Sequence, residues 1–297
     1  MELLSVPGEL LGTGSYGNVF KIYHNDVEYA VKRQKTDSSS LFYAAVREEF
    51  CGGFKHCNLI TRHSSVWSNY QWCGVYEMGV PLDTYAPHHK VLWDITSGLA
   101  FLHARGIVHR DITPGNIVSV GQRYKIIDFG LARPMSLTSR CQTPDMVTLN
   151  CRPIEILHGH RTDARCDVWS LGVICLSLNR QHAVFTGGKK NMIRQYSLLS
   201  FDYQEKIYSK MLCGLDERFT SFQLCDALGL SYTLDTGVSV PYIKGDHLRT
   251  VLGHDVNIDK YSKDGFGYHT NGSSASASSG ASSGSGSGSG PSTVSTS

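Results

Sequence analysis

The chain has 297 residues, 41% of them hydrophobic and 18% charged, so it can bury the core of one large domain or of two lobes. Its formal net charge of +2 argues against a protein that coats nucleic acid and against an acidic disordered chain. The longest strongly apolar run, about Leu171–Leu178, is far shorter than the roughly 20 residues that cross a bilayer. We therefore expect a soluble protein with no membrane partner and no direct nucleic-acid partner.

Nine cysteines are scattered through the chain without a Cys-x-x-Cys pair, which argues against a zinc ribbon or a thioredoxin-like site. Their number is odd and several lie within apolar runs, which favours reduced cysteines in the core of an intracellular protein. The N-terminus lacks the basic-then-apolar pattern of a signal peptide. These features predict an intracellular location, cytoplasmic or nuclear.

Strands dominate the predicted elements at the start of the chain. Residues 10–32 alternate apolar and polar side chains around glycines and an Asn-Asp turn, which predicts three strands, the first two joined by a glycine-rich loop. The serines at 38–40 precede a predicted helix over about 41–50, and residues 59–79 predict two more strands. Together these elements indicate a small β-rich unit.

Helices are predicted for most of the chain that follows. Residues 90–105 carry leucine and isoleucine at helical spacing and end before a glycine. Residues 167–178 are apolar almost all round, which predicts a buried helix. Two shorter helices are predicted within 203–230.

The organisation of the chain follows from these elements. We predict a β-rich lobe over about 1–80, a helical lobe over about 81–250 and a C-terminal extension over 251–297. From about residue 271 the extension is nearly all Ser, Gly and Ala. Such a composition cannot form a core, so we expect a disordered tail there.

A polar string in the middle of the chain carries the strongest chemical signal. The run His109-Arg110-Asp111-Ile112-Thr113-Pro114-Gly115-Asn116 is followed by Asp128-Phe129-Gly130. Asp111 can accept a proton from an attacking hydroxyl. Asn116 and Asp128 offer hard oxygen ligands of the kind that Mg²⁺ takes together with phosphate oxygens. The spacing therefore suits phosphoryl transfer from a metal–nucleotide complex.

Four further motifs accompany this string in a fixed order. Gly12-Thr13-Gly14-Ser15-Tyr16-Gly17-Asn18-Val19 and Tyr29-Ala30-Val31-Lys32 precede it, and Arg152-Pro153-Ile154-Glu155 and Asp167-Val168-Trp169-Ser170 follow it. In this order the motifs resemble those of the eukaryotic protein kinase family over about residues 8–230. The resemblance implies an α+β, bilobal protein kinase fold with a small β-rich N-lobe and a larger helical C-lobe. It also implies an enzyme that uses ATP and Mg²⁺.

The resemblance assigns most of the nucleotide site to the N-lobe. The glycines of the glycine-rich loop would let backbone amides approach the phosphates, and Lys32 would hold the α- and β-phosphates. Residues 77–79 would form the hinge beside adenine, with Tyr76 at the gatekeeper position. The residues expected to contact ATP are Gly12, Thr13, Gly14, Ser15, Tyr16, Gly17, Val19, Ala30, Lys32, Glu77 and Met78.

The catalytic roles are implied in the same way. Asp111 would be the catalytic base, and Asn116 and Asp128 would hold the metal, whereas His109 would be a structural core residue. Lys32 would need an acidic partner from the helix predicted over 41–50, which corresponds to helix C of the family.

Two neighbouring acids compete for the role of that partner. Glu48 and Glu49 both lie in the predicted helix. The string Ala45-Val46-Arg47-Glu48 resembles the corresponding stretch of cyclin-dependent kinases, which favours Glu48.

Residues 147–157 resemble the activation segment of cyclin-dependent kinases. Thr148 would then lie in the substrate-docking loop and bond Asp111, which implies Ser or Thr in the substrate. The family's Trp-Tyr is replaced by Asn150-Cys151 and its Ala-Pro by Pro153-Ile154. These replacements depart from the pattern that goes with proline-directed specificity.

Two further features follow from the same resemblance. Glu155 and Arg218 are expected to form a buried ion pair. Thr143 is the expected site of activating phosphorylation, because it matches the activating threonine in register. The arginines expected to face the phosphate are Arg47, Arg110 and Arg133.

One position departs from the family and leaves alternatives open. Thr113 stands where Ser/Thr kinases usually carry a lysine that contacts the γ-phosphate. The surrounding string is similar to that of herpesvirus-type kinases, which suggests a divergent viral enzyme acting in a host cell. The main interpretation is a kinase of protein Ser/Thr, with protein substrates and a regulatory partner at helix C. The alternatives are a pseudokinase that scaffolds or binds nucleotide, and a small-molecule kinase, against which the full activation segment argues.

Overall fold

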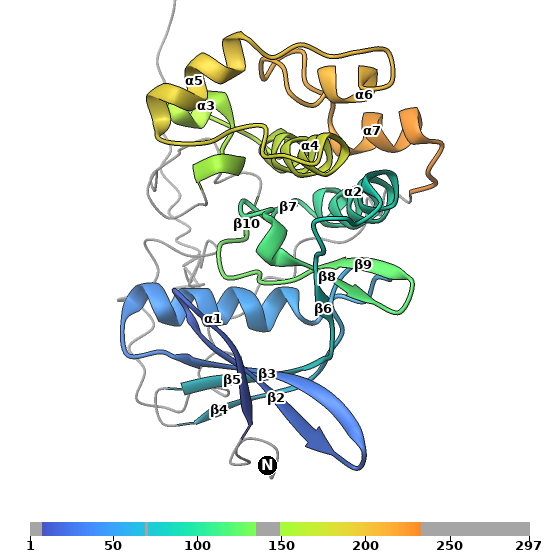
Figure 1. Ribbon diagram of the computed structural model, residues 1–297. Coiled ribbons are helices and arrows are strands. Elements are labelled where there is room, and N and C mark those ends of the chain that lie inside the picture. Colours follow the sequence, from blue (N-terminus) through green and yellow to red (C-terminus); the bar gives the residue numbers. More distant parts are fainter. Residues whose placement is uncertain (1–7, 69–70, 135–148, 233–297) are drawn as a thin grey trace, which may run out of the picture.

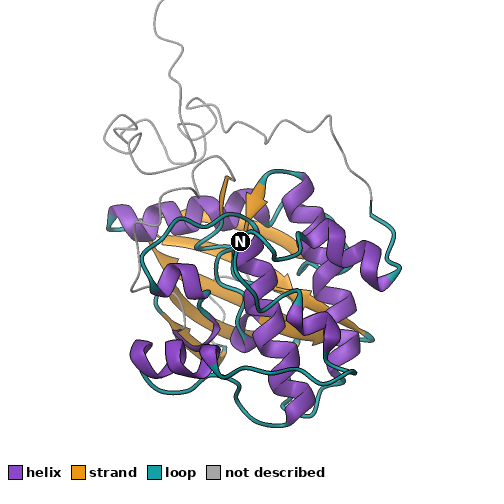
Figure 2. Cartoon of the chain, turned by 90° about the horizontal axis from the view of Figure 1, so that it is seen from above, coloured by secondary structure: helices purple, strands orange, loops and turns teal. Residues whose placement is uncertain are grey.

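The computed structural model describes residues 8–68, 71–134 and 149–232, and the account below concerns those residues (Figure 1). A β-rich N-lobe and a helical C-lobe lie one beyond the other, as the bilobal α+β prediction requires. Seen from above, the helices lie over the strands (Figure 2). Within the described residues, no helix is both long enough and apolar enough to cross a membrane.

The N-lobe is a five-stranded antiparallel sheet with one helix packed beside it. The strands stand in the order β1-β2-β3-β5-β4. Their bounds are β1 Glu9–Gly14, β2 Gly17–His24, β3 Val27–Lys35, β4 Arg62–Ser68 and β5 Gln71–Glu77. Asn25 and Asp26 turn β2 into β3 with φ of 50° and 62°, the left-handed geometry that such short hairpin turns require. Helix α1 (Ser39–Cys51) begins after Ser38, whose hydroxyl accepts from the Leu41 amide.

Helices α2 and α4 form the centre of the C-lobe. The helices are α2 His88–Ala104, α3 Ile154–Leu157, α4 Arg165–Arg180, α5 Lys189–Ser197, α6 Lys206–Ser209 and α7 Ser221–Leu228. Helix α2 packs against both α4 and α7, and all three helices contribute to one large apolar core. Gly172 lets α4 approach its neighbour, since a Cβ there would lie 2.9 Å from Met211 Cβ.

Short strands connect the lobes and position the loops between them. Strands β6 (Val80–Pro81), β8 (Ile117–Val120) and β9 (Arg123–Ile126) form a small sheet. Strand β7 (Ile107–Val108) pairs with β10 (Arg133–Pro134). The loop over residues 109–116 therefore starts at β7 and ends at β8. Short 3₁₀ turns lie at Pro114–Asn116 and Leu149–Cys151.

The longer predicted elements are confirmed. The strands expected within 10–32 and 59–79 are present, as are the helices expected over 41–50, 90–105 and 167–178. Two short helices lie within 203–230 as predicted. Helix α5 was missed because its composition is polar around most of its surface, with Met192 its one buried residue. Thr143, Thr148 and the predicted extension over 251–297 lie outside the described residues.

Candidate active site

Asp111 and Asn116 are five residues apart in the loop over residues 109–116 and contact each other. The Asn116 amide nitrogen donates to the Asp111 carbonyl oxygen (2.8 Å) and to its carboxylate Oδ2 (2.9 Å). These bonds fix the Asp111 carboxylate and direct the Asn116 amide oxygen away from it. The loop thus presents a carboxylate with an amide bonded to it.

Asp167, near the start of α4, holds the beginning of this loop. Its two carboxylate oxygens accept from the His109 and Arg110 amides, both at 2.8 Å, and His103 Nε2 lies 3.0 Å from Oδ2. Burial raises the pKa of Asp167, but the bond to His103, the charges of His103 and His109 and the bond from the Arg110 amide together outweigh burial and lower the pKa. The anion therefore holds Arg110 in its left-handed conformation, with φ of 70°.

His109 is fully buried and faces the core, as the structural interpretation expects. Its Nε2 donates to the Ile127 carbonyl oxygen (3.1 Å), and its ring meets Phe129 edge-on at 5.5 Å. These contacts tie the loop to the segment that carries Asp128. They keep the ring of His109 away from any reacting group.

Lys32 of β3 lies between two carboxylates. Its ammonium pairs with Glu48 of α1 and lies 3.0 Å from Asp128 Oδ1. Burial lowers the pKa of Lys32, yet the charges of Asp128 and Glu48 outweigh burial and raise it. Burial raises the pKa of Asp128, but Lys32 outweighs it and lowers the pKa to about 2. The lysine is therefore a permanent cation beside an ionised Asp128.

The two neighbouring glutamates of α1 point to different partners. Glu48 Oε1 also accepts from the Phe129 amide (3.2 Å), and Glu48 Oε2 accepts from the Tyr76 hydroxyl (3.2 Å). Glu49 instead pairs with Arg62 at 2.9 Å and accepts from the Trp72 indole N–H at 2.8 Å. Of the two candidates, Glu48 is the residue that the structure brings to Lys32.

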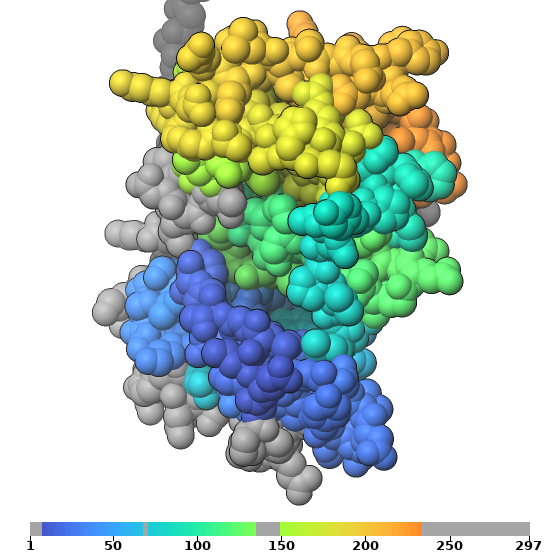
Figure 3. Space-filling view, in the orientation of Figure 1, coloured from blue at the N-terminus to red at the C-terminus, as the bar shows by residue number. Residues whose placement is uncertain are grey.

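A cavity of about 300 Å³ opens between the lobes beside these groups. Figure 3 shows the hollow between the dark blue N-terminal strands and the C-lobe. Residues expected at the nucleotide that line it are Gly12, Val19, Ala30, Lys32, Glu77, Met78 and Asp128. Glu48, Tyr76 and the hinge residue Gly79, all expected near the nucleotide, also line it. Lining residues that sequence reasoning missed are Leu11, Ile60, Pro81, Gly115, Val118 and Ile127. Most of the missed residues are apolar and lie near one of the motifs in the sequence. That position beside a motif was the only sequence signal that they line the cavity.

Residues 13–17 of the glycine-rich loop lie outside the cavity lining, and their glycines serve different ends. A Cβ on Gly17 would lie 2.3 Å from the Arg33 carbonyl oxygen, so the close packing of β2 on β3 requires glycine there. A Cβ on Gly12 would meet nothing within 4 Å, so Gly12 borders open space. Tyr16 turns inward against Gly130, and burial raises the pKa of its hydroxyl.

The hinge segment over residues 77–79 lines the cavity. The Glu77 carboxylate is engaged elsewhere, accepting from Lys125 Nζ (2.6 Å) and from the Thr61 amide (2.7 Å). The Glu77 amide donates to the Thr61 carbonyl oxygen at 3.0 Å. An adenine edge would therefore use the Glu77 carbonyl or the Met78 backbone rather than the Glu77 N–H.

The oxygen atoms near Asp111 fit a magnesium–nucleotide complex. Asn116 Oδ1 faces away from Asp111, and Asp128 uses its Oδ1 for Lys32 and for the Gly130 amide (3.1 Å). Amide and carboxylate oxygens are hard ligands that suit Mg²⁺ when phosphate oxygens complete the coordination. Among the described residues, no cluster of three or more His, Cys, Asp or Glu side chains could hold a metal alone.

Three arginines come together beside this site. Arg47 Nε donates to the Gly130 carbonyl oxygen at 2.6 Å. Burial, with the charges of Arg133 and Arg110 beside it, lowers the pKa of Arg47 to about 10. The structure therefore gathers the three cations that were expected to face a phosphate on Thr143, which lies outside the described residues.

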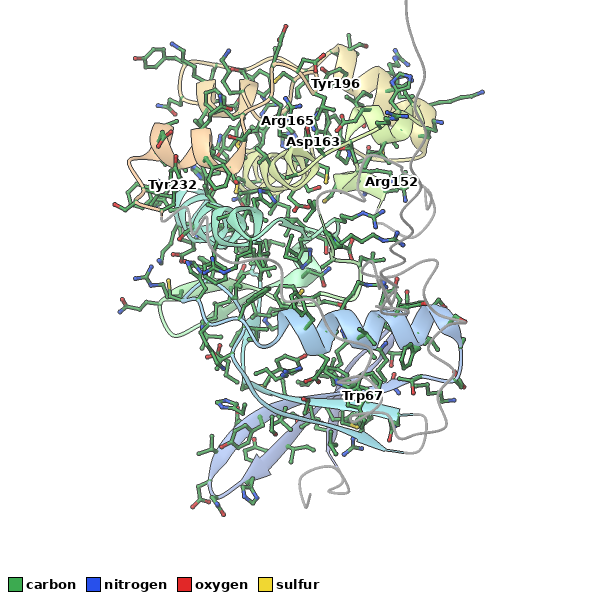
Figure 4. The ribbon with its side chains drawn as sticks, turned by 180° about the vertical axis from the view of Figure 1, so that it is seen from behind. Trp67, Arg152, Asp163, Arg165, Tyr196 and Tyr232 are labelled. Carbon is green, nitrogen blue, oxygen red and sulfur yellow. The ribbon has the colours of Figure 1, made fainter. Side chains whose placement is uncertain are left out.

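The expected pair of Glu155 and Arg218 is present and buried. Arg218 Nη1 and Nη2 donate to the two Glu155 oxygens, both at 2.8 Å, and Thr162 donates to Oε1 at 3.1 Å. The guanidinium also lies over the Trp169 ring at 4.7 Å. Asp163 and Arg165 form a more exposed pair at the start of α4 (Figure 4).

Comparison with known proteins agrees with this geometry. Residues 6–222 match the protein kinase domain family. Cyclin-dependent kinase 2 of Caenorhabditis elegans is 36% identical over 198 residues, which cover 60% of this chain and 54% of that protein. Cyclin-dependent kinase 14 of Callithrix jacchus is 30% identical over 198 residues, which cover 61% of this chain and 47% of that protein. The chain thus spans about half the length of the curated relatives it matches. With most of its length matched, the chain belongs to the protein kinase domain family.

Proposed function

We propose that this chain is an ATP- and Mg²⁺-dependent kinase of protein Ser/Thr residues. The observation that carries the proposal is the joint placement of two sets of groups at one cavity. Lys32, Glu48 and Asp128 form an ion-pair chain at its inner end. Asp111 and Asn116 form a bonded pair in the loop that also contributes Gly115 to the cavity. Positioning and charge are what phosphoryl transfer requires of a protein.

The proposed roles of the residues rest on this geometry together with the kinase resemblance. Lys32 would bind the α- and β-phosphates, with Glu48 orienting it. Asn116 and Asp128 would hold Mg²⁺, which when bound neutralises charge on the phosphates. Asp111 would orient the acceptor hydroxyl and take its proton as the new O–P bond forms and the bond to the bridging oxygen breaks, leaving ADP.

The direct test is transfer from labelled ATP to a Ser/Thr peptide library. We expect Mg²⁺-dependent labelling of Ser or Thr by the wild type. Asp111→Asn should abolish labelling while fluorescent-nucleotide binding stays near normal, because Asp111 acts on the acceptor. Wild-type protein that binds nucleotide but labels no peptide would support the pseudokinase alternative, which Thr113 favours.

The remaining features of the function are proposed on narrower grounds. Protein substrates and a regulatory partner at α1 rest on the similarity to cyclin-dependent kinases. An intracellular location rests on the eight described cysteines, all of which are free. A viral origin stays a prediction from the string Asp111–Asn116.

A further inference from the structure

A second cavity, of about 390 Å³, lies in the C-lobe directly beside the nucleotide cavity. At two places in the chain, adjacent residues line different cavities. Pro81 and Gly115 line the nucleotide cavity, whereas Leu82 and Pro114 line the second one. The second cavity therefore starts on the other side of the 3₁₀ turn that ends at Asn116.

The lining of this second cavity is mainly apolar. Its apolar members include Leu82, Val173, Ile174, Leu178, Ala183 and Phe185. Among the described lining residues, the only carboxylate is that of Asp83, and its Oδ1 already accepts from the Tyr85 amide at 2.7 Å. Lysine and arginine are absent from that lining. The chemistry therefore suits an uncharged, apolar side chain.

The floor of the cavity is fixed by buried contacts. Phe185 is buried and stacks on Trp169, with ring centroids 6.1 Å apart and planes 5° apart. Trp169 also packs against Tyr196 at 5.4 Å and beneath the guanidinium of Arg218. Arg218 is in turn paired with Glu155, so Phe185 rests on a chain of buried contacts. Such a preformed pocket binds without a large ordering cost.

The cavity also lies close to Asp111. Cys151 lines it, and burial together with the charge of Asp111 raises the pKa of the Cys151 thiol to about 12. Asn150 and Cys151 line it at the positions where the cyclin-dependent string has two large aromatic side chains. The smaller side chains leave more volume at this edge.

We propose that this cavity receives one apolar side chain of the protein substrate, within a few residues of the phosphorylated Ser or Thr. The proposal rests on the proposed function. A protein substrate whose Ser or Thr is held at Asp111 must continue past the loop over residues 109–116, beside which the cavity lies. An extended peptide advances about 3.3 Å per residue, so a short stretch reaches from one site to the other. The cavity is a specificity pocket for the acceptor chain.

The test uses peptides with one acceptor serine and a single leucine moved through each flanking position. The full chain and its Ala183→Glu variant are compared, since Ala183 lines the cavity and is exposed. Leu198→Glu is the matched control, because Leu198 is 70% exposed and does not line the cavity. Peptide binding is measured by fluorescence anisotropy beside kcat and KM.

We expect the wild type to favour leucine at one position by about tenfold or more in kcat/KM. Ala183→Glu should remove that preference through KM and leave the KM for ATP unchanged, whereas Leu198→Glu should retain it. A preference that survives Ala183→Glu, or no preference at any position, overturns the proposal. If Ala183→Glu raises activity on all peptides equally, a segment of this chain occupies the cavity and the proposal is again wrong. If no peptide is phosphorylated, the proposed function fails, and leucine-dependent binding lost in Ala183→Glu still decides the pocket.

Discussion

Asp167 of α4 holds the main chain of Arg110 through a 2.8 Å bond from the Arg110 amide to Oδ1. Arg110 has φ of 70°, a conformation that costs energy for any residue with a Cβ. A buried anion on one helix thus fixes the backbone one residue before Asp111. The geometry of the proposed base depends on a helix more than 50 residues further along the chain.

Replacing Asp167 by asparagine should therefore lower both stability and turnover. An amide in this place can satisfy only one of the two backbone donors, which typically costs roughly 1–3 kcal/mol. We expect a lower kcat with a nearly unchanged KM for ATP. Thermal melts and steady-state kinetics measure these effects, with the exposed Asp226→Asn as control. Unchanged kcat in a destabilised Asp167→Asn would show that the bond is only structural.

Arg218→Ala should strongly destabilise the C-lobe. It leaves the Glu155 carboxylate buried without its partner, a change that costs about 3–5 kcal/mol. Arg165→Ala, which breaks the more exposed pair with Asp163, should cost about 1 kcal/mol or less. Urea denaturation of both variants compares the two pairs. Similar, small losses for both would contradict a buried pair.

Glu48→Gln should lower activity strongly and Glu49→Gln hardly at all, although the two residues are adjacent. Glu48→Gln removes one of the two anions beside Lys32, the one supplied by α1. The lysine then loses its fixed position, and we expect roughly a 10²-fold loss of kcat/KM. Glu49→Gln keeps an oxygen for Trp72 and Arg62 and should stay within a few-fold of wild type. Peptide phosphorylation at saturating and limiting ATP measures both. Equal losses would remove Glu48 from its proposed role.

The pair of Arg180 and Glu205 should give stability that depends on pH in the acid range. The bond from Arg180 lowers the pKa of Glu205 below its ordinary 4.5. The stabilisation is therefore fully present above pH 4.5 and is lost as the pH falls through the lower, folded pKa. Glu205→Gln should cost about 1–3 kcal/mol at pH 7 and progressively less below pH 4.5. Urea midpoints of both proteins between pH 7 and 3.5 measure this difference, and a difference independent of pH would contradict it.

Phosphorylation of Thr143 should activate the enzyme. A phosphate adds about −1.5 to −2 charges, which would relieve the mutual repulsion of Arg47, Arg110 and Arg133. Thr143→Ala should then have a lower kcat than phosphorylated wild type. Mass spectrometry of the active protein, with kinetics of Thr143→Ala, gives the answer. Fully active protein with an unmodified Thr143 and no loss in Thr143→Ala would reject the hypothesis.

The order of motifs along the chain was enough to predict the family, the bilobal fold and most of the longer elements. Local patterns carried that information, because the Asn25-Asp26 turn and the apolar face of α2 depend on neighbours within a few residues. Helix α5 escaped because it is short and mostly polar, and the two-residue strands because two residues carry no pattern. Sequence also named Lys32, Asp111, Asn116 and Asp128 as the residues to examine.

Only the tertiary structure decided which of these groups meet. Glu48 and Glu49 are chemically identical and adjacent, so residue type alone does not show which of them pairs with Lys32. The rotation of α1 places one toward Lys32 and the other toward Arg62. The second cavity likewise depends on residues 82–85, 150–151 and 173–185, which are distant in sequence and are brought together by the packing of α4. Contacts between distant segments set these features, and no local pattern records them.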